Sequence, residues 1–139
     1  MYGSGLRVME GLRPRVKDLD LEQRQLTVRT GKGQVDRVTI LAQSVIEPLS
    51  RHLRYVKVVH DNDLAQGYGR VEIPDALGVS YPAAEREWIW QYVFPGASRA
   101  DGCRRHIHQS CLRKAIKHAV RMARISKRVT CHTLRRPFS

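Results

Sequence analysis

The chain has 139 residues and a mass of 16.0 kDa, which is enough for one domain whose hydrophobic core needs no disulfide or metal. Its formal net charge is +12 and its pI is about 10.4, and such an excess favours a polyanionic partner, of which nucleic acid is the most common. No stretch approaches the roughly 18 apolar residues of a membrane span and the start lacks the apolar core of a signal peptide, so we expect a cytoplasmic protein with no membrane partner.

The first predicted elements are a short helix and a β-hairpin. Residues 6–12, "LRVMEGL", have apolar residues at helical spacing, and Pro14 ends the pattern early. Apolar residues then alternate over 26–28 and again over 38–40, on either side of a Gly-Lys-Gly turn. This pattern predicts a β-hairpin with Lys32 at or beside its tip.

A longer helix and an irregular segment follow. Residues 42–64, "AQSVIEPLSRHLRYVKVVHDNDL", have apolar residues at helical spacing and predict a helix, with Pro48 tolerated near its start. Residues 67–102 are rich in Gly and Pro and contain both tryptophans. We expect this stretch to be an inserted, loop-rich segment with a short helix near 83–88 and a short strand at 91–94.

The C-terminal part combines an amphipathic helix with most of the positive charge. Residues 107–124 predict a helix with one apolar and one positive side. Up to Asp101 the chain has 14 basic and 13 acidic residues, a net charge of +1, whereas residues 102–139 have 11 Lys and Arg and no acid. We therefore expect the polyanion to contact mainly this part. The apolar stripe, which we expect to be buried, consists of Ile107, Cys111, Leu112, Ala115, Ile116, Ala119, Val120 and Ala123.

A zinc site is the chemical alternative that these residues raise most directly. Cys103, His106, His108 and Cys111 have the residue types that zinc prefers, but the spacing C-x2-H-x-H-x2-C matches no common zinc finger. The stretch "TGKGQ" also lacks the first Gly and the Ser or Thr of a phosphate-binding loop. We expect no metal and no cofactor, and a zinc-stabilised nucleic-acid module remains the weakest alternative.

Three quoted segments resemble one family of DNA enzymes. "YGSGLRVMEGLRPRVKDLDLEQRQLTVRTGKGQVDRVTIL" resembles the opening of the catalytic domain of tyrosine site-specific recombinases, the phage-integrase superfamily, and "CHTLRRPFS" resembles their "HTLRHSFA" segment. "GYGRVEIPDALGVSYPAAEREWIWQYVFPGASR", with the helix that follows, is similar to the insertion of integron integrases. The resemblance covers essentially the whole chain. It implies an α+β, mostly helical recombinase catalytic core, truncated, with a small antiparallel sheet around residues 25–41.

The resemblance also implies a set of catalytic residues. In that family a tyrosine hydroxyl attacks a DNA phosphodiester, which leaves a covalent phosphotyrosine and a free 5′ hydroxyl. Arg7 and Arg135 would bind the non-bridging oxygens, on which the transition state concentrates negative charge. Lys32 would protonate the leaving oxygen, His132 would assist proton movement or hold the phosphate, and Glu10 would orient Arg7 or another group of the site. Each residue alone is typical of solvated surface, and their joint order and spacing favour the site.

The insertion is expected to contact DNA as well. In integron integrases it contacts bases extruded from a folded single-stranded site, and aromatic and imidazole side chains suit unpaired bases. Packing in a core is the alternative role of the two tryptophans. The DNA-binding candidates of this part are Trp88, Trp90, His106, Arg104, Arg105 and Lys117.

Three positions depart from the family pattern. Arg136 and Pro137 stand where the family has His and Ser, and Val35 stands where a second Lys is usual. Pro137 would strain a helix that continued through this turn.

The family pattern also predicts what residues 1–139 lack. The N-terminal DNA-clamping domain and the nucleophile segment have no counterpart, so we expect a partial catalytic domain with the integron-type insertion at about 67–102 that binds DNA but does not cut it. Family members form tetramers on DNA. The alternative is a basic DNA-binding module that reuses the core without chemistry. All five tyrosines precede the "HTLR" motif: Tyr2, Tyr55, Tyr68, Tyr81 and Tyr92.

Overall fold

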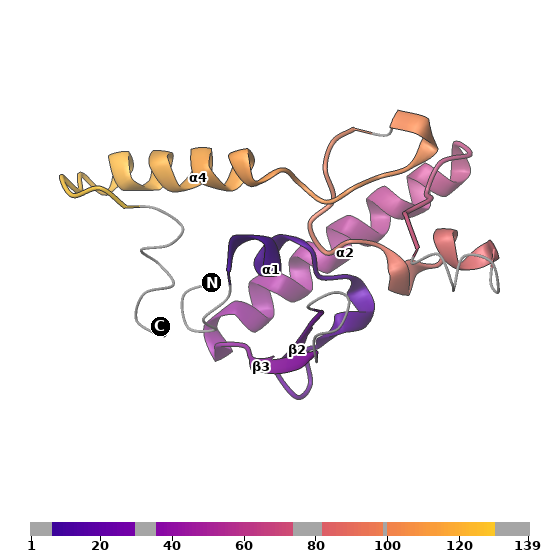
Figure 1. Cartoon of the computed structure of the whole chain (residues 1–139), viewed down its shortest axis with the longest axis horizontal. Helices are drawn as coiled ribbons and strands as arrows, with labels where there is room; N and C mark the ends of the chain where they lie inside the picture. Colours follow the sequence, from indigo (N-terminus) through magenta and orange to yellow (C-terminus); the bar gives the residue numbers. More distant parts are fainter. Residues whose placement is uncertain (1–6, 30–35, 74–81, 99, 130–139) are drawn as a thin grey trace.

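The computed structural model describes residues 7–29, 36–73, 82–98 and 100–129 (Figure 1). Helices dominate it, as predicted, and one small sheet is present. The body contains the short α1, the sheet and the long α2, while α4 extends away from the body (Figure 1). None of the described helices has the length and apolar character that crossing a membrane requires.

The sheet confirms the predicted hairpin and adds a strand to it. Strands β1 (Leu19–Asp20), β2 (Gln25–Val28) and β3 (Arg37–Ile40) are antiparallel and lie in the order β1-β2-β3. Leu26 is paired with Thr39 across the two longer strands. The strand β1 was not predicted, because two residues are too few to show a periodicity of two.

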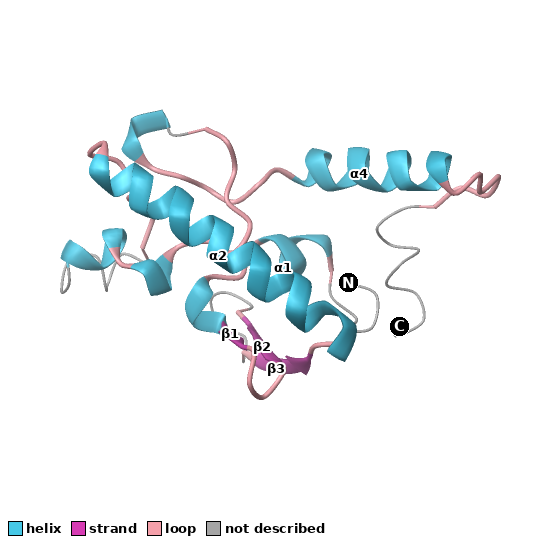
Figure 2. Cartoon of the chain, turned by 180° about the vertical axis from the view of Figure 1, so that it is seen from behind, coloured by secondary structure: helices cyan, strands magenta, loops and turns pink. Residues whose placement is uncertain are grey.

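One face of the sheet forms the hydrophobic core with the start of α2 (Gln43–Ala65). Leu26, Val28 and Leu41 are buried together, and Leu49 of α2 packs against them. Figure 2 shows the sheet beside α1 and α2 from behind. Because β3 leads almost directly into α2, the sheet and the first turns of that helix are held together by the chain itself.

The three longer predicted helices are present in the structure, with changed bounds. The first helix, α1, spans Val8–Leu12, and α2, Gln43–Ala65, differs by one residue at each end from the predicted 42–64. The last, α4, spans Gln109–Met122, and the ring of His108 caps it by accepting a hydrogen bond from the backbone N–H of Ser110.

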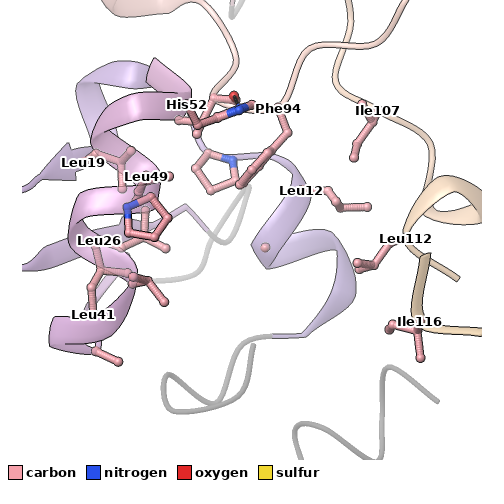
Figure 3. A pocket seen from close by; sticks show the side chains of 16 residues that line it. Leu12, Leu19, Leu26, Leu41, Leu49, His52, Phe94, Ile107, Leu112 and Ile116 are labelled. Atoms are coloured by element: carbon pink, nitrogen blue, oxygen red, sulfur yellow. Dashed lines mark hydrogen bonds between the residues drawn. The ribbon is translucent and has the colours of Figure 1, made fainter. Parts of the chain in front are cut away.

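The expectation that one side of α4 is buried is wrong. None of its described residues is buried, and Cys111, expected in the apolar stripe, is exposed. The physical reason is that α4 meets the body along one edge near α1 instead of packing into a closed core (Figure 1). Leu112 and Ile116 are half-buried at this edge. They line an open apolar groove of about 510 Å³, whose opposite wall is formed by α2 and the sheet (Figure 3).

The insertion, residues 67–102, is held by isolated contacts instead of regular strands. The helix predicted near 83–88 is replaced by two 3-10 helices, Pro82–Arg86 (η2) and Trp88–Trp90 (η3). The strand predicted at 91–94 is wrong, because the pairings here are single bridges. These bridges, together with the backbone hydrogen bonds next to them, involve Pro14, Arg15, Val16, Gln91, Tyr92, Val93, Pro95 and His106.

Candidate nucleic-acid interface

Arg7 lies exposed at the start of α1, and a carboxylate connects this point to the sheet. The backbone N–H of Arg7 donates a hydrogen bond of 2.8 Å to Oε1 of Glu10. Oε2 of Glu10 pairs with Nη2 of Arg37 in β3 at 2.9 Å. Glu10 therefore orients the backbone of Arg7 and connects α1 to the strand that follows the predicted Lys32 turn.

The base of that turn is held by ion pairs. Nε of Arg29 lies 3.0 Å from Oδ1 of the buried Asp18, and its Nη1 lies 2.9 Å from Oδ2 of Asp36. The hydrogen bond to Asp18 is the main reason why the pKa of Arg29 is raised. Arg29 is therefore fixed between the 3-10 helix Val16–Asp18 and the start of β3.

Three of the four predicted catalytic residues lie outside the described residues: Lys32, His132 and Arg135. Arg7 is described, with its side chain exposed to solvent. The convergence of these four side chains on one phosphate therefore stays a prediction.

Both tryptophans of the insertion are half-buried, and each ring lies close to a cation. The Trp88 ring is 5.6 Å from Nζ of Lys57 and 5.9 Å from the ring of His60, centre to centre. The Trp90 ring is 4.4 Å from Nζ of Lys17 and 5.6 Å from Cζ of Arg15. Each tryptophan thus has an indole face next to positive charge, which attracts the electron-rich face.

The remaining predicted residues of the insertion differ in their surroundings. The ring of His106 meets Tyr92 edge to face at 5.4 Å, and its Nδ1 lies 2.8 Å from the carbonyl oxygen of Ile107. Arg105 is exposed and lies 3.3 Å from Glu72. Lys117 is exposed on α4.

Arg104 is bound inside the protein. Its Nε and Nη2 lie 2.8 and 2.9 Å from the two carboxylate oxygens of Asp63 in α2, and its Nη1 donates to the carbonyl oxygen of Gly96 at 2.7 Å. This two-pronged geometry is the strongest form of an arginine–carboxylate pair. In the structure Arg104 fixes the end of the insertion to α2, and its predicted contact with DNA is not tested by these bonds.

The helix α4 and the residues after it present a positive surface. Fourteen residues make a rod of about 21 Å at the usual rise per residue. No acidic residue occurs from Gly102 onward, so nothing in this segment neutralises its cations. The exposed basic residues are Arg113, Lys114, Lys117, Arg121, Arg124, Lys127 and Arg128.

The zinc alternative finds no ligand set in the part of the chain that the structure describes. No group of three or more His, Cys, Asp or Glu side chains there could hold a metal ion. Cys103 is half-buried and Cys111 is exposed, and both are free thiols.

Arg15 and Lys17, whose cations lie beside Trp90, were not predicted from the sequence. Both stand in the basic stretch "RPRVK", and nothing local distinguishes them from solvated surface. Their contact with Trp90 joins segments more than 70 positions apart, and a single sequence carries no signal of such a pairing.

The chain is similar to known proteins in sequence and in fold. The sequence model of the Phage integrase family matches residues 1–139. The chain is 37% identical over 145 residues to an integrase/recombinase of Escherichia coli and equally to one of Pseudomonas aeruginosa, and it covers 43% of the length of each. It is 39% identical over 54 residues to the tyrosine recombinase XerA of Pyrococcus furiosus. A crystal structure of XerA recombinase superposes with a TM-score of 0.62 at 26% identity, over 99% of this chain and 37% of that one.

Proposed function

Because the chain belongs to the phage integrase family, we propose that it acts in site-specific DNA recombination, in which strands are cut and rejoined through a phosphotyrosine intermediate. The match of that family over residues 1–139 is the observation that carries the proposal. The similarity in fold to a XerA recombinase over 99% of the chain supports it. The excess of positive charge from Gly102 onward suits a DNA substrate.

The proposed chemistry assigns a role to each candidate. A tyrosine oxygen forms a bond to phosphorus while the bond from phosphorus to the 5′ oxygen breaks. Arg7 and Arg135 bind the non-bridging oxygens, where preorganised cations stabilise the developing charge. Lys32 delivers a proton to the leaving 5′ oxygen, and His132 holds the phosphate or moves a proton. The link from Glu10 to Arg37 supports these roles, because it connects Arg7 to the hairpin that bears Lys32.

The nucleophile is proposed to lie outside these four groups and outside residues 1–139. None of the five tyrosines follows Arg135 in the sequence. Of the three described ones, Tyr55 is 66% exposed on α2, Tyr68 is 36% exposed, and Tyr92 accepts a hydrogen bond from Arg15. The polypeptide of residues 1–139 is therefore expected to bind DNA without forming a covalent adduct on a nicked suicide substrate.

Within the phage integrase family, we propose that the chain belongs to the integron integrases, which move gene cassettes. The insertion with Trp88 and Trp90 supports it, since half-buried indoles beside cations suit unpaired bases of a folded strand. Assembly as a tetramer on DNA belongs to the same proposal.

A chimera tests the catalytic assignment. The matching 43% of the Escherichia coli relative is replaced by these 139 residues, and strand cleavage is measured on a nicked suicide substrate. Arg7→Lys is expected to lower cleavage about 100-fold or more, as the loss of one transition-state donor does. Arg13→Lys changes an exposed arginine six positions later and should leave cleavage within about twofold, since most surface changes are near neutral. Equal cleavage by both variants would contradict the role of Arg7.

A basic DNA-binding module without chemistry is the second candidate. The observation that favours it is the row of exposed cations on α4, which needs no active site to bind a phosphate backbone. A chimera that binds DNA tightly and never forms the covalent adduct would support this candidate.

A further inference from the structure

The backbone of Arg7 is held at both of its polar groups. Arg7 is the N-cap of α1, and its N–H donates a hydrogen bond to Oε1 of Glu10 at 2.8 Å. Its carbonyl oxygen accepts a hydrogen bond from the N–H of Gly11 at 3.0 Å. Since Arg7 is exposed, the direction in which its guanidinium extends depends on how firmly these two bonds hold its backbone.

The helix α1 is too short to hold its own beginning in place. It has five residues, and isolated helices shorter than about 12 residues are marginal in water. Leu12, at its end, is buried in the body, whereas Arg7, at its beginning, is exposed. The beginning of α1 therefore needs a contact with another element, and Glu10 makes this contact.

The carboxylate of Glu10 connects α1 to strand β3. Its Oε2 lies 2.9 Å from Nη2 of Arg37, while Oε1 accepts the hydrogen bond from Arg7. A carboxylate that is bound at both oxygens cannot rotate freely, so the acceptor for the N–H of Arg7 stays in place. The Glu10 side chain is 17% exposed, and water therefore replaces either partner less readily than it would at the surface.

Arg37 is attached to a firm part of the fold. It is the first residue of β3 and is paired with Val28 of β2. Residues that lie directly opposite each other point to the same face of a sheet, and Val28 is buried in the core. The Arg37 side chain therefore leaves the sheet from its core-facing side, and the sheet determines where the guanidinium can meet Glu10.

The pair of Glu10 and Arg37 is better suited to orientation than to stability. The Arg37 side chain is 46% exposed, and ion pairs of exposed side chains contribute little to folding. One nitrogen–oxygen contact joins the two side chains, in contrast to the two-pronged pair of Arg104 and Asp63. Loss of Arg37 should therefore change the position of Arg7 more than it changes the stability of the fold.

We propose that Arg37 is a positioning residue for Arg7, which it holds through Glu10 in the orientation that binds a non-bridging oxygen of the scissile phosphate. Catalysis is sensitive to such placement, because a displacement of about 1 Å can lower a rate by about 100-fold. The inference rests on the proposed function and deepens it, because it adds a residue that controls the geometry of the proposed site.

Cleavage by the chimera is compared on three nicked suicide substrates. The first is ordinary DNA. In the second, a methyl group replaces one non-bridging oxygen of the scissile phosphate and removes the charge that Arg7 would bind. In the third, sulfur replaces the 5′ bridging oxygen, so that a thiolate leaves without the proton that Lys32 would deliver.

Arg37→Gln is expected to lower cleavage of ordinary DNA about tenfold, because Arg7 is then less well placed. The loss should shrink to about twofold on the methyl-substituted substrate, which has no charge for Arg7 to stabilise, and should stay about tenfold on the sulfur-substituted one. Arg7→Lys should show the same pattern with a larger loss. Arg37→Lys can keep the single contact with Glu10 and should retain cleavage within about threefold.

Arg29→Gln is the matched control. Arg29 is a second ion-paired arginine of the hairpin, 52% exposed, but its partners are Asp18 and Asp36. Any loss of cleavage that this variant causes should be the same on ordinary and methyl-substituted DNA. The proposal is overturned if Arg37→Gln and Arg29→Gln behave alike on the three substrates, or if the sulfur substitution removes the loss caused by Arg37→Gln.

A second measurement needs no cleavage. In the ¹⁵N-labelled polypeptide of residues 1–139, Glu10→Ala shows where the amide resonance of Arg7 lies without its acceptor. Arg37→Gln should move this resonance most of the way to that position, and Arg29→Gln should leave it unchanged. An unmoved resonance in Arg37→Gln overturns the proposal whatever the chimera does.

The proposed function can fail separately. If the chimera forms no adduct while Arg37→Gln moves the resonance, Arg37 still positions Arg7 and only the recombination chemistry is lost. Circular dichroism follows the folding of each variant. Arg37→Met, which keeps an unbranched stem without the charge, replaces Arg37→Gln in both measurements if the latter unfolds.

Discussion

The body of the protein and the helix α4 both carry positive charge, but they use it differently. In the body, Arg104 and Arg29 are bound to buried carboxylates of Asp63 and Asp18. Between described residues, no ion pair involves α4, and none of its side chains is buried. Cations in the body therefore hold segments together, whereas those of α4 are available to an external polyanion.

The ion pair between Asp63 and Arg104 is expected to give the largest effect on stability. Asp63→Ala leaves Arg104, whose side chain is 14% exposed, without its carboxylate partner. Removing one partner of a buried ion pair lowers the free energy of unfolding by about 3–5 kcal/mol. The free energy of unfolding in urea measures the loss. Asp61→Ala, in the exposed pair with Lys57 on the same helix, should cost less than about 1 kcal/mol. Similar losses for the two variants would mean that Arg104 does not fix the insertion to α2.

Substitutions of apolar side chains test the same difference between the body and α4. Leu26→Ala in the sheet removes a side chain that is 3% exposed and should cost about 3 kcal/mol of unfolding free energy. Ile116→Ala on α4 removes a half-buried side chain and should cost about 1 kcal/mol or less. A loss at Ile116 as large as that at Leu26 would show that α4 belongs to the core.

Removing positive charge from α4 should weaken DNA binding and leave the stability of the fold unchanged. The double variant Lys117→Gln, Arg121→Gln is expected to reduce the salt dependence of DNA affinity by about two counterions, because each phosphate contact contributes about one. Its urea midpoint should match that of the unaltered chain, since both side chains are exposed. An unchanged salt slope would exclude α4 from the DNA interface.

The smallest expected effect is a dependence of the unfolding free energy on pH, which arises from His60 in α2. Burial lowers the pKa of His60 below its ordinary value of 6.5, and the contributions of Lys57, Asp61 and Asp63 are smaller. The unfolded chain therefore binds the proton more readily, so the stability from the neutral ring is complete above pH 6.5 and is lost as the pH falls below it. His60→Gln should reduce the slope of the unfolding free energy against pH in this range. His118→Gln, exposed on α4, should keep the slope.

Local patterns predicted the regular elements of this fold well. The hairpin was found from alternation around a Gly-Lys-Gly turn, and α4 was found from its apolar stripe, because both are short-range periodicities. The strand at 91–94 was wrong, since Tyr92 meets only a single bridge from Arg15, 77 positions away in the chain. The burial of Cys111 was wrong for a similar reason: a stripe identifies the apolar side of a helix, and its neighbours decide how far that side is covered.

The sequence alone predicted the proposed partner class of this protein, because net charge and its concentration after Asp101 are properties of composition. It also gave the order of the candidate catalytic residues and the resemblance to the phage integrase family, which the match to residues 1–139 confirms. Only the tertiary structure decided which groups surround each cation. Arg104 and Lys17 look alike in the sequence, but Arg104 is bound to Asp63 and Lys17 lies beside the ring of Trp90. The reason is physical: the energy of a charge depends on the distance and burial of its partners, and both arise only when distant segments meet.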